Sequence, residues 1–379
     1  MELSELRNKI DKIDDKIVGL FAERMALSGE IAKIKSESGR NITDGEREKE
    51  IIFRLSRSAP EELTLYIKEL YETVFFTSKA YQSLKMKRTS PTSEKIAEII
   101  EKRLSDAPVS ATVACQGVKG ANSGAAAQRI FPVSEVTYFR NFAGVFGAVE
   151  SGLCEFGVLP IENSTAGSVL EVYDLMKKYD FHIVRSIKVK INHCLCALPA
   201  AKKSDISKII SHPQALAQCD GYIRQFGVKA EPEENTAVSA KRVAESGDIS
   251  LACICSESCA SVYGLKILEK DIQDSDANYT RFICITKDLK VYKGADRISV
   301  MTSLSHEPGS LNKILGKFSA LGLNLTKLES RPIAGSNFEF MFYFDFEGDV
   351  TDPNVRTLIA ELENGSDNFV FLGAYKEKA

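Results

Sequence analysis

The feature that most constrains this chain is a seam of apolar residues along its first tenth. The opening positions recur at steps of three and four residues, at Leu3, Leu6, Ile10, Ile13, Ile17 and Leu20, and the series continues at Met25, Leu27, Ile31 and Ile34. This spacing predicts one long amphipathic helix that continues to about Lys35. At 1.5 Å per residue such a helix spans about 50 Å. It cannot bury its seam alone and must pair with other helices, which can come from a second subunit.

Further helical stretches follow, and residues 1–88 are therefore predicted to form an all-α domain. A second helix ends at Ala59-Pro60, and a third runs from about Pro60 to Lys85. Residues 89–110 are predicted to be a linker. Its start, 89–93, is expected to be exposed because it is polar and contains a proline, and a short helix is predicted from Glu94 to Leu104.

Short apolar stretches typical of strands alternate with helical stretches in residues 111–288. This alternation predicts an α/β domain with a largely parallel sheet, and its length favours two lobes around a cleft. Residues 296–379 show a different order of predicted elements: strand, helix, two strands, helix and strand. That βαββαβ order predicts an α+β, ferredoxin-like module. The fold class is thus multidomain, which agrees with a length of 379 residues.

The composition excludes several classes of protein. The chain has 49 Lys and Arg against 52 Asp and Glu, and this net charge of -3 argues against a nucleic-acid partner. No apolar run approaches the roughly 20 residues that a membrane helix needs, so no membrane partner is expected. The N-terminus carries no visible secretory signal. The nine cysteines all lie between Cys115 and Cys284 and are interpreted as reduced thiols of a cytoplasmic protein.

Charged side chains of the helical region are the first candidate site. Arg24 and Lys35 lie about three turns apart and project from nearly the same face of their helix. Arg7 lies too far along a straight helix to share their pocket, but an antiparallel second subunit could bring its own Arg7 across. The later helices add further polar candidates, which are Asp44, Arg47, Glu48, Ser78 and Gln82. Taken singly, each is more simply explained as a solvated side chain of a helical bundle.

Together these residues form a more specific pattern, in the strings Leu6-Arg7-Asn8-Lys9-Ile10-Asp11, Ala22-Glu23-Arg24, Lys35, Asp44-Gly45-Glu46-Arg47-Glu48 and Ser78 with Gln82. The pattern resembles the all-helical chorismate mutases over residues 1–88. The resemblance implies an intertwined dimer. It also implies that Arg7 of the other subunit, Arg24 and Arg47 hold two substrate carboxylates and that Ser78 supports one of them. Lys35 and Gln82 would donate to the ether oxygen, and Asp44 and Glu48 would receive the ring hydroxyl.

Those residue types suit a Claisen rearrangement, which needs neither a nucleophile nor a proton transfer. It needs a flexible dianion held in its reactive shape and donors aimed at the breaking C–O bond. One such donor is typically worth about 3–4 kcal/mol in the transition state. Lys35 is therefore expected to be the most costly single loss in this domain.

Polar strings at the ends of predicted strands are the second candidate site. They are Glu162-Asn163-Ser164 with Gly167-Ser168, His212-Pro213-Gln214, and Thr280-Arg281-Phe282. Loops at the carboxyl ends of strands are where open α/β sheets bind ligands. The strings resemble the prephenate dehydratases over residues 111–288, although Ala121-Asn122 stands where that family has a Ser-Tyr-like pair.

The resemblance implies catalysis at the junction of two lobes. Thr280 would hydrogen-bond the departing hydroxyl, Arg281 would anchor a carboxylate, and Phe282 would shape the pocket. Further polar contacts would come from Asn163, Ser164 and Gln214. The proton donor stays open between Glu162, His212 and water, and Glu162 has a competing role as a helix N-cap. No cofactor and no metal are expected at either site.

The C-terminal region carries two further strings, Gly309-Ser310-Leu311 and Glu329-Ser330-Arg331-Pro332. They resemble an ACT regulatory domain of the phenylalanine-binding kind. The resemblance implies that these modules dimerise side by side and bind L-phenylalanine at their interface as a feedback inhibitor. A homodimer or a homotetramer is expected.

The order of the three regions resembles the bifunctional chorismate mutase–prephenate dehydratase family of L-phenylalanine biosynthesis. The chain is expected to convert chorismate to prephenate and prephenate to phenylpyruvate. Two alternatives stay open for the central region, a dehydratase that prefers arogenate and a non-catalytic amino-acid sensor.

Overall fold

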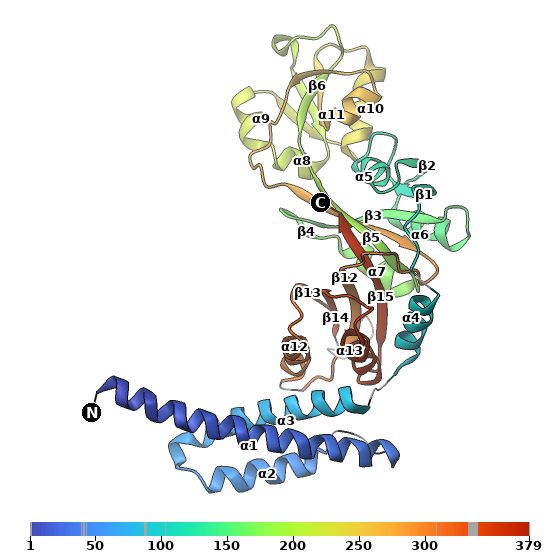
Figure 1. Cartoon of the computed structure of the whole chain (residues 1–379). Helices are drawn as coiled ribbons and strands as arrows, with labels where there is room; N and C mark the ends of the chain where they lie inside the picture. The colour runs from blue at the N-terminus through green and yellow to red at the C-terminus, as the bar shows by residue number, and fades with distance from the viewer. Residues whose placement is uncertain are drawn as a thin grey trace. The chain divides into compact units, whose positions relative to one another are not determined.

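The computed structural model describes residues 2–38, 40, 42, 44–86, 89–102, 104–307, 309–332 and 340–378. The chain divides into two compact units (Figure 1). The first unit comprises Met1–Lys102 and Met301–Phe369, and the second comprises Arg103–Val300 and Val370–Ala379. The boundary between the units falls within two strands, β12 and β15.

The first unit begins with an all-helical domain, as the sequence predicts. Its elements are α1 (Leu3–Glu37), α2 (Gly45–Arg57), the short 3-10 helix η1 (Glu61–Leu63) and α3 (Thr64–Met86). Both α1 and α2 pack against α3. The contact between α1 and α3 is close because α1 presents small residues there. A Cβ on Gly29 would lie 3.4 Å from the Tyr81 ring.

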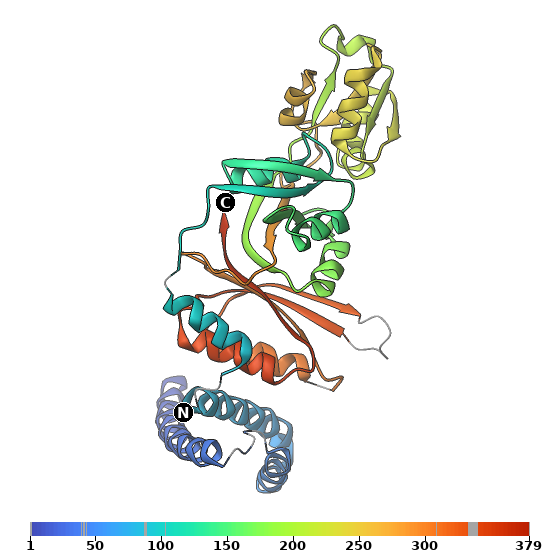
Figure 2. The same ribbon diagram turned by 90° about the vertical axis from the view of Figure 1, so that its right-hand side faces the viewer.

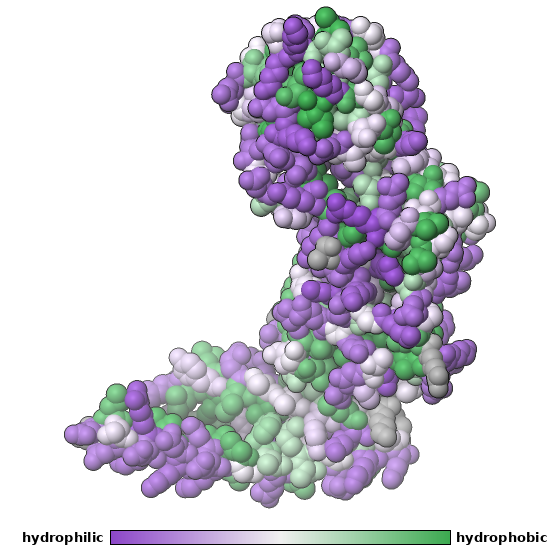
Figure 3. Space-filling model, turned by 45° about the horizontal axis from the view of Figure 1, so that its top comes forward, coloured by the Kyte–Doolittle hydropathy of each residue, from purple (hydrophilic) through white to green (hydrophobic). Residues whose placement is uncertain are grey.

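Most of the α1 seam remains exposed in a single chain. Leu6, Ile10, Ile13 and Ile17 are 42 to 57% exposed, whereas the buried positions of α1 are Ser28, Gly29 and Ala32. Figure 3 shows apolar side chains at the surface of this helical domain. The seam is therefore an apolar surface that this chain does not itself cover.

The C-terminal module of the first unit has the order βαββαβ. Its elements are β12 (Arg297–Ser303), α12 (Ser310–Ala320), β13 (Leu325–Pro332), β14 (Phe340–Glu347), α13 (Pro353–Asn364) and β15 (Phe369–Lys378). The strands lie in the order β13-β14-β12-β15. Phe318 of α12 packs against Phe344 and Phe346 of β14, which fixes the helix on the sheet.

The segment predicted as an exposed linker is different in the structure. Helix α4 (Pro91–Glu101) lies beside α13 (Figure 2). The backbone N and Oγ1 of Thr92 donate to the Glu363 carboxylate at 3.2 and 3.0 Å, and Ile96 is fully buried. Proline and serine at the start of this segment are N-terminal helix signals, since Ser90 caps α4 and Pro91 opens it. The expectation of an exposed segment at 89–93 is therefore wrong for Ser90 and Ser93, which are buried, whereas the predicted short helix is present and begins three residues earlier.

The second unit contains the two lobes of the central domain. The first lobe is a sheet in the order β5-β11-β3-β1-β2, with β4 beside β3. Its elements are β1 (Ser110–Gln116), α5 (Asn122–Ile130), β2 (Val133–Phe139), α6 (Phe142–Glu150), β3 (Phe156–Asn163), β4 (Gly167–Ser168), α7 (Leu170–Lys178), β5 (His182–Lys190) and β11 (Tyr279–Thr286).

The second lobe is a separate sheet in the order β10-β6-β9-β7-β8. Its elements are β6 (Cys194–Ala197), η2 (Lys203–Asp205), β7 (Lys208–Ser211), α8 (Pro213–Ala217), α9 (Asp220–Phe226), β8 (Lys229–Pro232), α10 (Thr236–Ser246), β9 (Leu251–Cys255), α11 (Glu257–Val262) and β10 (Lys266–Glu269). The chain crosses between the lobes twice, after β5 and before β11, which Figure 1 shows as two extended segments.

Both sheets are mixed, which corrects the expectation of a largely parallel sheet. In the first lobe β1 runs parallel to β2 and β3, but β11 is antiparallel to both β3 and β5. In the second lobe β6 is antiparallel to β9 and β10. The antiparallel strands are those on either side of the two crossings, where the chain leaves one lobe and returns to it.

The cysteines pack in the cores of these lobes. All nine are buried free thiols, and Cys194, Cys196, Cys253, Cys255 and Cys259 share one apolar cluster of the second lobe. Burial raises the pKa of Cys115 to about 12, which leaves it a protonated thiol at neutral pH. Within the described part of the chain, no helix is long and apolar enough to cross a bilayer.

Candidate active sites

The helical domain brings several of the predicted site residues to the face where α1 meets α3. Arg24 of α1 donates to the Ser78 hydroxyl of α3, and its guanidinium lies 5.7 Å from the centre of the Phe75 ring. Ser78 is buried, and Gln82, one turn further along α3, is only 7% exposed. The Gln82 Oε1 atom has no hydrogen-bond partner among the residues that the structure describes. A buried amide oxygen without a partner costs about 1–3 kcal/mol.

Charged groups of α1 and α2 border the same region. The Lys35 ammonium donates to the Ile42 carbonyl at 2.6 Å. Asp44 caps α2 by accepting from the Arg47 amide at 3.1 Å, and the Arg47 side chain forms an ion pair with Glu50 at 2.6 Å. These interactions hold three of the predicted binding residues in place.

Lys79 of α3, which the sequence did not single out, donates to both carboxylate oxygens of Glu48, at 3.0 and 3.1 Å. A lysine one residue after Ser78 gives no local sign of pairing with an acid on another helix. Arg7 lies on the exposed N-terminal part of α1, about 42 Å along the helix from Lys35.

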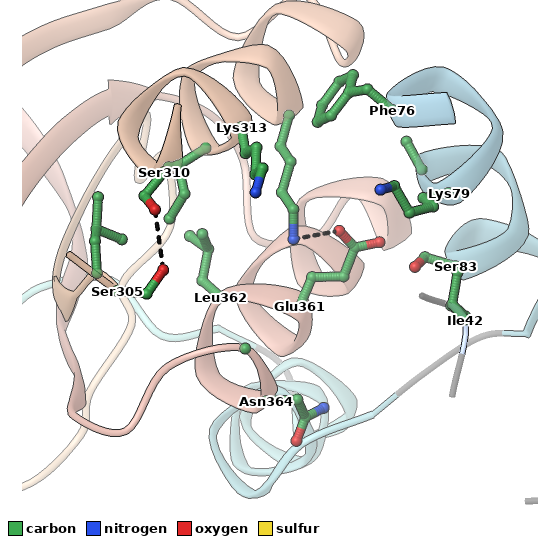
Figure 4. Close-up of a pocket in the computed structure, with 15 residues that line it drawn as sticks. Ile42, Phe76, Lys79, Ser83, Ser305, Ser310, Lys313, Glu361, Leu362 and Asn364 are labelled. Carbon is green, nitrogen blue, oxygen red and sulfur yellow. Dashed lines mark hydrogen bonds and ion pairs between the residues drawn. The ribbon is translucent and has the colours of Figure 1, made fainter. Parts of the chain in front are cut away.

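A pocket of about 360 Å³ lies beside Lys79 within the first unit (Figure 4). Phe76, Lys79 and Ser83 of α3 border it on one side, and Lys313 and Lys317 of α12 border it on the other. Lys317 is already paired with Glu361 of α13 at 3.0 Å. None of the predicted site residues of the helical domain lines this pocket, so we assign it no part in the site.

The central domain has a cavity of about 300 Å³ at the junction of its two lobes. The first lobe contributes the loop before α5, the end of β3 and the start of β11, and the second lobe contributes the starts of α8 and α10. Asn163, His212, Gln214, Thr280 and Phe282 line it, as predicted site residues. Among the described residues that line it there is no Lys, Arg, Asp or Glu.

Thr280 and Asn163 form the polar centre of this cavity. They are opposite each other in the β3–β11 ladder, and the Asn163 Nδ2 donates to the Thr280 Oγ1 at 2.9 Å. The amide orientation is fixed because the Asn163 Oδ1 accepts from the backbone amides of Thr165 and Ala166, at 3.1 and 2.9 Å. Since the Thr280 oxygen already accepts a hydrogen bond, its own proton is available to a ligand.

Three residues outside the predicted set extend this polar network. Gln218 Oε1 lies 2.9 Å from His193 Nε2 and also accepts from Asn278 Nδ2 at 3.0 Å. The Asn278 Oδ1 accepts from Asn163 Nδ2 and so connects this pair to the centre of the cavity. Because an amide oxygen only accepts, the His193 proton is on Nε2. Burial lowers the pKa of His193 despite the opposing effect of Gln218, so the ring is neutral at pH 7. These contacts join positions that are distant in the sequence, which local patterns do not reveal.

His212 is also neutral at pH 7, because burial lowers its pKa. Its Nδ1 accepts from the Gln214 backbone amide at 3.2 Å, so the proton of the neutral ring is on Nε2. His212 is thus the N-cap of α8 as well as a wall of the cavity.

Three predicted site residues do not line the cavity, and these assignments need correction. Ser164 Oγ donates to the Ala277 carbonyl at 2.6 Å and accepts from the Tyr279 amide at 2.9 Å, which ties β3 to β11. Glu162 and Arg281 are opposite each other in the ladder, on the face away from Asn163 and Thr280. Successive residues of a strand point to opposite faces, so Arg281 cannot face the cavity between Thr280 and Phe282, which both do.

Comparison with known proteins identifies the families of the helical and central domains. Residues 6–83 match the family model of type II chorismate mutases, and residues 113–290 match that of prephenate dehydratases. The chain is 30% identical to the bifunctional chorismate mutase/prephenate dehydratase of Escherichia coli (strain K12), over 98% of this chain and 96% of that one. The chain belongs to this bifunctional family. We therefore call its helical and central domains the mutase and dehydratase domains.

Two other relatives each match about 70% of the chain. An arogenate dehydratase/prephenate dehydratase of Arabidopsis thaliana is 38% identical, over 69% of this chain and 72% of its own. A prephenate dehydratase of Arthrobacter aurescens, solved in complex with L-Phe, is 31% identical with a TM-score of 0.64, over 70% of this chain and 89% of its own.

The C-terminal module separates its predicted effector residues into two groups. Ser310 and Leu311, at the start of α12, line a cavity of about 340 Å³ together with Phe340 and Phe342, and Gly309 is the N-cap of the same helix. The second group lies on β13, which is the edge strand of the module; it comprises Glu329, Ser330, Arg331 and Pro332.

Proposed function

We propose that the mutase domain rearranges chorismate to prephenate and that the dehydratase domain converts prephenate to phenylpyruvate. The C-terminal module is proposed to act as an ACT domain of ferredoxin-like fold, at which L-phenylalanine inhibits the enzyme. Membership of the bifunctional family supports both reactions. The observation that carries the dehydratase assignment is the Thr280 hydroxyl, held by Asn163 in a cavity without charged side chains.

In the proposed mutase site, Arg24 and Arg47 bind substrate carboxylates and Lys35 donates to the ether oxygen. Gln82 is proposed to donate to the ether oxygen through its Nε2, and its Oε1, which has no partner among the described residues, to accept from a donor on the ligand or the second subunit. Arg7 completes the site from the other subunit, and the exposed α1 seam supports an intertwined dimer. Asp44 and Glu48 are proposed to face the ring hydroxyl, with Lys79 paired to Glu48 at 3.0 Å.

In the proposed dehydratase reaction, the C–C bond to the ring carboxylate breaks and releases CO2. Its electron pair forms the new double bond of the aromatic ring, and the C–OH bond breaks at the opposite carbon. The departing hydroxide is stabilised by the Thr280 proton and the neutral polar groups beside it. Asn163, His212, Gln214 and Phe282 are proposed to contact the substrate. Of the proton donors open from the sequence, water and His212 remain, because Glu162 points away from the cavity.

The electrostatics of the cavity suit a decarboxylation. A cation beside the ring carboxylate would stabilise the ground state and slow its loss. The start of α5 can bind the second, pyruvyl carboxylate with a weaker positive field than an arginine has. Its N-cap residue, Ala121, has no side chain to accept from the first backbone amides of the helix, and Asn122 and Ser123 line the cavity. The N-terminus of a helix attracts anions through these amides. We therefore propose that the helix N-terminus, and no arginine, receives this carboxylate.

An arogenate-preferring enzyme is the second candidate, because of the plant relative. Arogenate differs from prephenate by an ammonium group, which a carboxylate side chain would bind well. The described residues that line the cavity include no Asp or Glu. This favours prephenate.

The test is to incubate the purified protein with chorismate and to follow chorismate loss and phenylpyruvate formation, with and without L-phenylalanine. The proposal predicts phenylpyruvate, in smaller yield when L-phenylalanine is present. Accumulation of prephenate would contradict the dehydratase assignment. Phenylalanine formed from added arogenate, faster than phenylpyruvate from prephenate, would favour the second candidate.

A further inference from the structure

Arg281 is a buried cation that the proposed reaction does not use. It lies between Thr280 and Phe282 on β11, is 9% exposed, and faces away from the cavity that both neighbours line. A buried charge needs partners that compensate for its lost hydration. The partners of Arg281 therefore indicate what it does.

Two of those partners come from the last residues of the chain. Arg281 Nη2 donates to the Tyr375 Oη at 2.7 Å, and Arg281 Nε lies 2.9 Å from the Glu377 Oε1. Tyr375 is 1% exposed, and its hydroxyl is also within 2.7 Å of the Ser299 Oγ on β12. The guanidinium is thus held by strand β15 through one aromatic hydroxyl and one carboxylate.

Glu377 is itself fixed from two sides. The Ser186 hydroxyl of β5 donates to its Oε1 at 3.3 Å, and the Lys188 ammonium lies 2.9 Å from its Oε2. The register explains this arrangement, since Glu377 is opposite Ser186 in the β15–β5 ladder and Arg281 is opposite Lys188 in the β5–β11 ladder. Arg281, Lys188, Ser186 and Glu377 therefore share one face across three strands.

The position of this cluster matters because the β3–β11 ladder is irregular at Arg281. Thr280 is opposite Asn163, but Phe282 is opposite Pro160, so the register shifts between Arg281 and Phe282. The shift brings both Asn163 and Pro160 to the cavity. Such bulges re-aim side chains beside active sites and leave the local ladder disrupted. The extra residue at this shift is Ile161 of β3, whereas β11 keeps a regular ladder with β5 from Tyr279 to Cys284. The aim of Thr280 therefore depends on how β11 is held from the β5 side.

We propose that Glu377 and Tyr375 are positioning residues of the dehydratase reaction. They hold Arg281, and Arg281 holds the part of β11 that lies opposite the β3 bulge, so that the Thr280 hydroxyl and the Phe282 ring face the substrate. This inference rests on the proposed dehydratase function. It also gives the C-terminal strand a direct part in the geometry of a site to which its own side chains do not contribute.

The test compares three variants of the full-length protein. Glu377→Gln keeps the size of the side chain and removes its charge, and Tyr375→Phe removes only the hydroxyl. Lys376→Gln is the matched control, because Lys376 lies on the same strand, is exposed, and points to the opposite face from Tyr375 and Glu377. Steady-state kcat and KM for prephenate are measured in each, with the mutase rate on chorismate as an internal reference for intact protein.

We expect Glu377→Gln to lower the dehydratase kcat about tenfold and Tyr375→Phe to lower it about threefold. A neutral hydrogen bond contributes about 0.5–1.5 kcal/mol and one to a charged group somewhat more, so the loss of the charged partner should have the larger effect. KM for prephenate and the mutase rate should stay within twofold, and Lys376→Gln should resemble the wild type. A wild-type kcat in both variants, or a raised KM with unchanged kcat, would overturn the proposal. If Glu377→Gln does not fold, Tyr375→Phe decides. A wild-type protein that forms no phenylpyruvate would instead refute the proposed function.

Discussion

The mutase and dehydratase sites of this chain are built in opposite ways for related dianions. The mutase domain gathers Arg24, Lys35, Arg47 and Lys79 on helices, and its site lacks a predicted arginine that another subunit would supply. The dehydratase cavity lies between two lobes of one chain, and its described lining includes no charged Lys, Arg, Asp or Glu. In the proposed account, one site uses cations and a partner subunit, and the other uses neither.

The difference follows from the two reactions. A Claisen rearrangement keeps both carboxylates, so cations can bind them tightly and still stabilise charge on the ether oxygen. The dehydratase must lose one carboxylate as CO2, and strong binding of that group would stabilise the ground state. The proposed sites therefore place charge where the anion persists and neutral donors where it is destroyed.

Replacing the donor of the mutase site is expected to have the largest effect. Lys35→Ala should lower the mutase kcat by about 10²–10³-fold, the usual loss for a donor to a developing negative charge. The dehydratase rate on added prephenate should not change. Lys33→Ala is the matched control, because Lys33 lies on the same helix in an exposed pair with Glu30. A mutase loss of equal size in both variants would refute the role of Lys35.

Removing the neutral donor of the dehydratase cavity should have the next largest effect. Thr280→Val keeps the shape of the side chain and should lower the dehydratase kcat about 10²-fold, within the range for a positioned proton donor. Thr280→Ser, which retains the hydroxyl, should keep most of the activity, and chorismate should still be consumed normally. Wild-type phenylpyruvate formation by Thr280→Val would disprove the assignment.

Disrupting the α1 seam tests whether only the mutase site needs a partner. Ile13→Glu places a charge on an exposed seam position and should weaken helix pairing. The partner is proposed to contribute Arg7. A hydrogen bond to a charged group is typically worth roughly 2 kcal/mol, so its loss would lower mutase kcat/KM about 30-fold. Dehydratase kcat/KM should stay constant. Asp15→Lys, also exposed on α1 but off the seam, serves as the control; equal losses in the two variants would contradict the account.

The pH dependence of the dehydratase rate should be the smallest of these effects. Burial lowers the pKa of His193 and His212, so both rings stay neutral from high pH down to below their ordinary value of about 6.5. The dehydratase rate should be flat over that range. Below it, protonation of His212 would remove the acceptor for the Gln214 amide, and the rate should fall several-fold. In His212→Asn, whose side chain retains a neutral cap, the decline should be smaller. A rate that rises as pH falls, after subtraction of an enzyme-free blank, would contradict this.

The two sites also differ in how far the sequence predicts them. Helix periodicity places α1 and α3 well, and Arg24, Ser78 and Gln82 can be chosen because a helix fixes which residues share a face. The directions of β5, β6, β10 and β11 depend on the crossings between lobes, which no local pattern encodes.

Arg281 shows a limit that strand geometry itself could have removed. Three consecutive residues of a strand cannot all face one pocket, so the triplet Thr280-Arg281-Phe282 had to contain a residue pointing away. Gln218, Asn278 and His193 were missed for a different reason. They meet Asn163 only when the two crossing segments come together.

The most direct test of two separate sites is the product of the Thr280→Val variant supplied with chorismate at neutral pH. The account predicts that prephenate accumulates as chorismate disappears, with almost no phenylpyruvate, and that addition of the Lys35→Ala variant converts the accumulated prephenate. Phenylpyruvate formed at the wild-type rate by Thr280→Val alone would contradict the account.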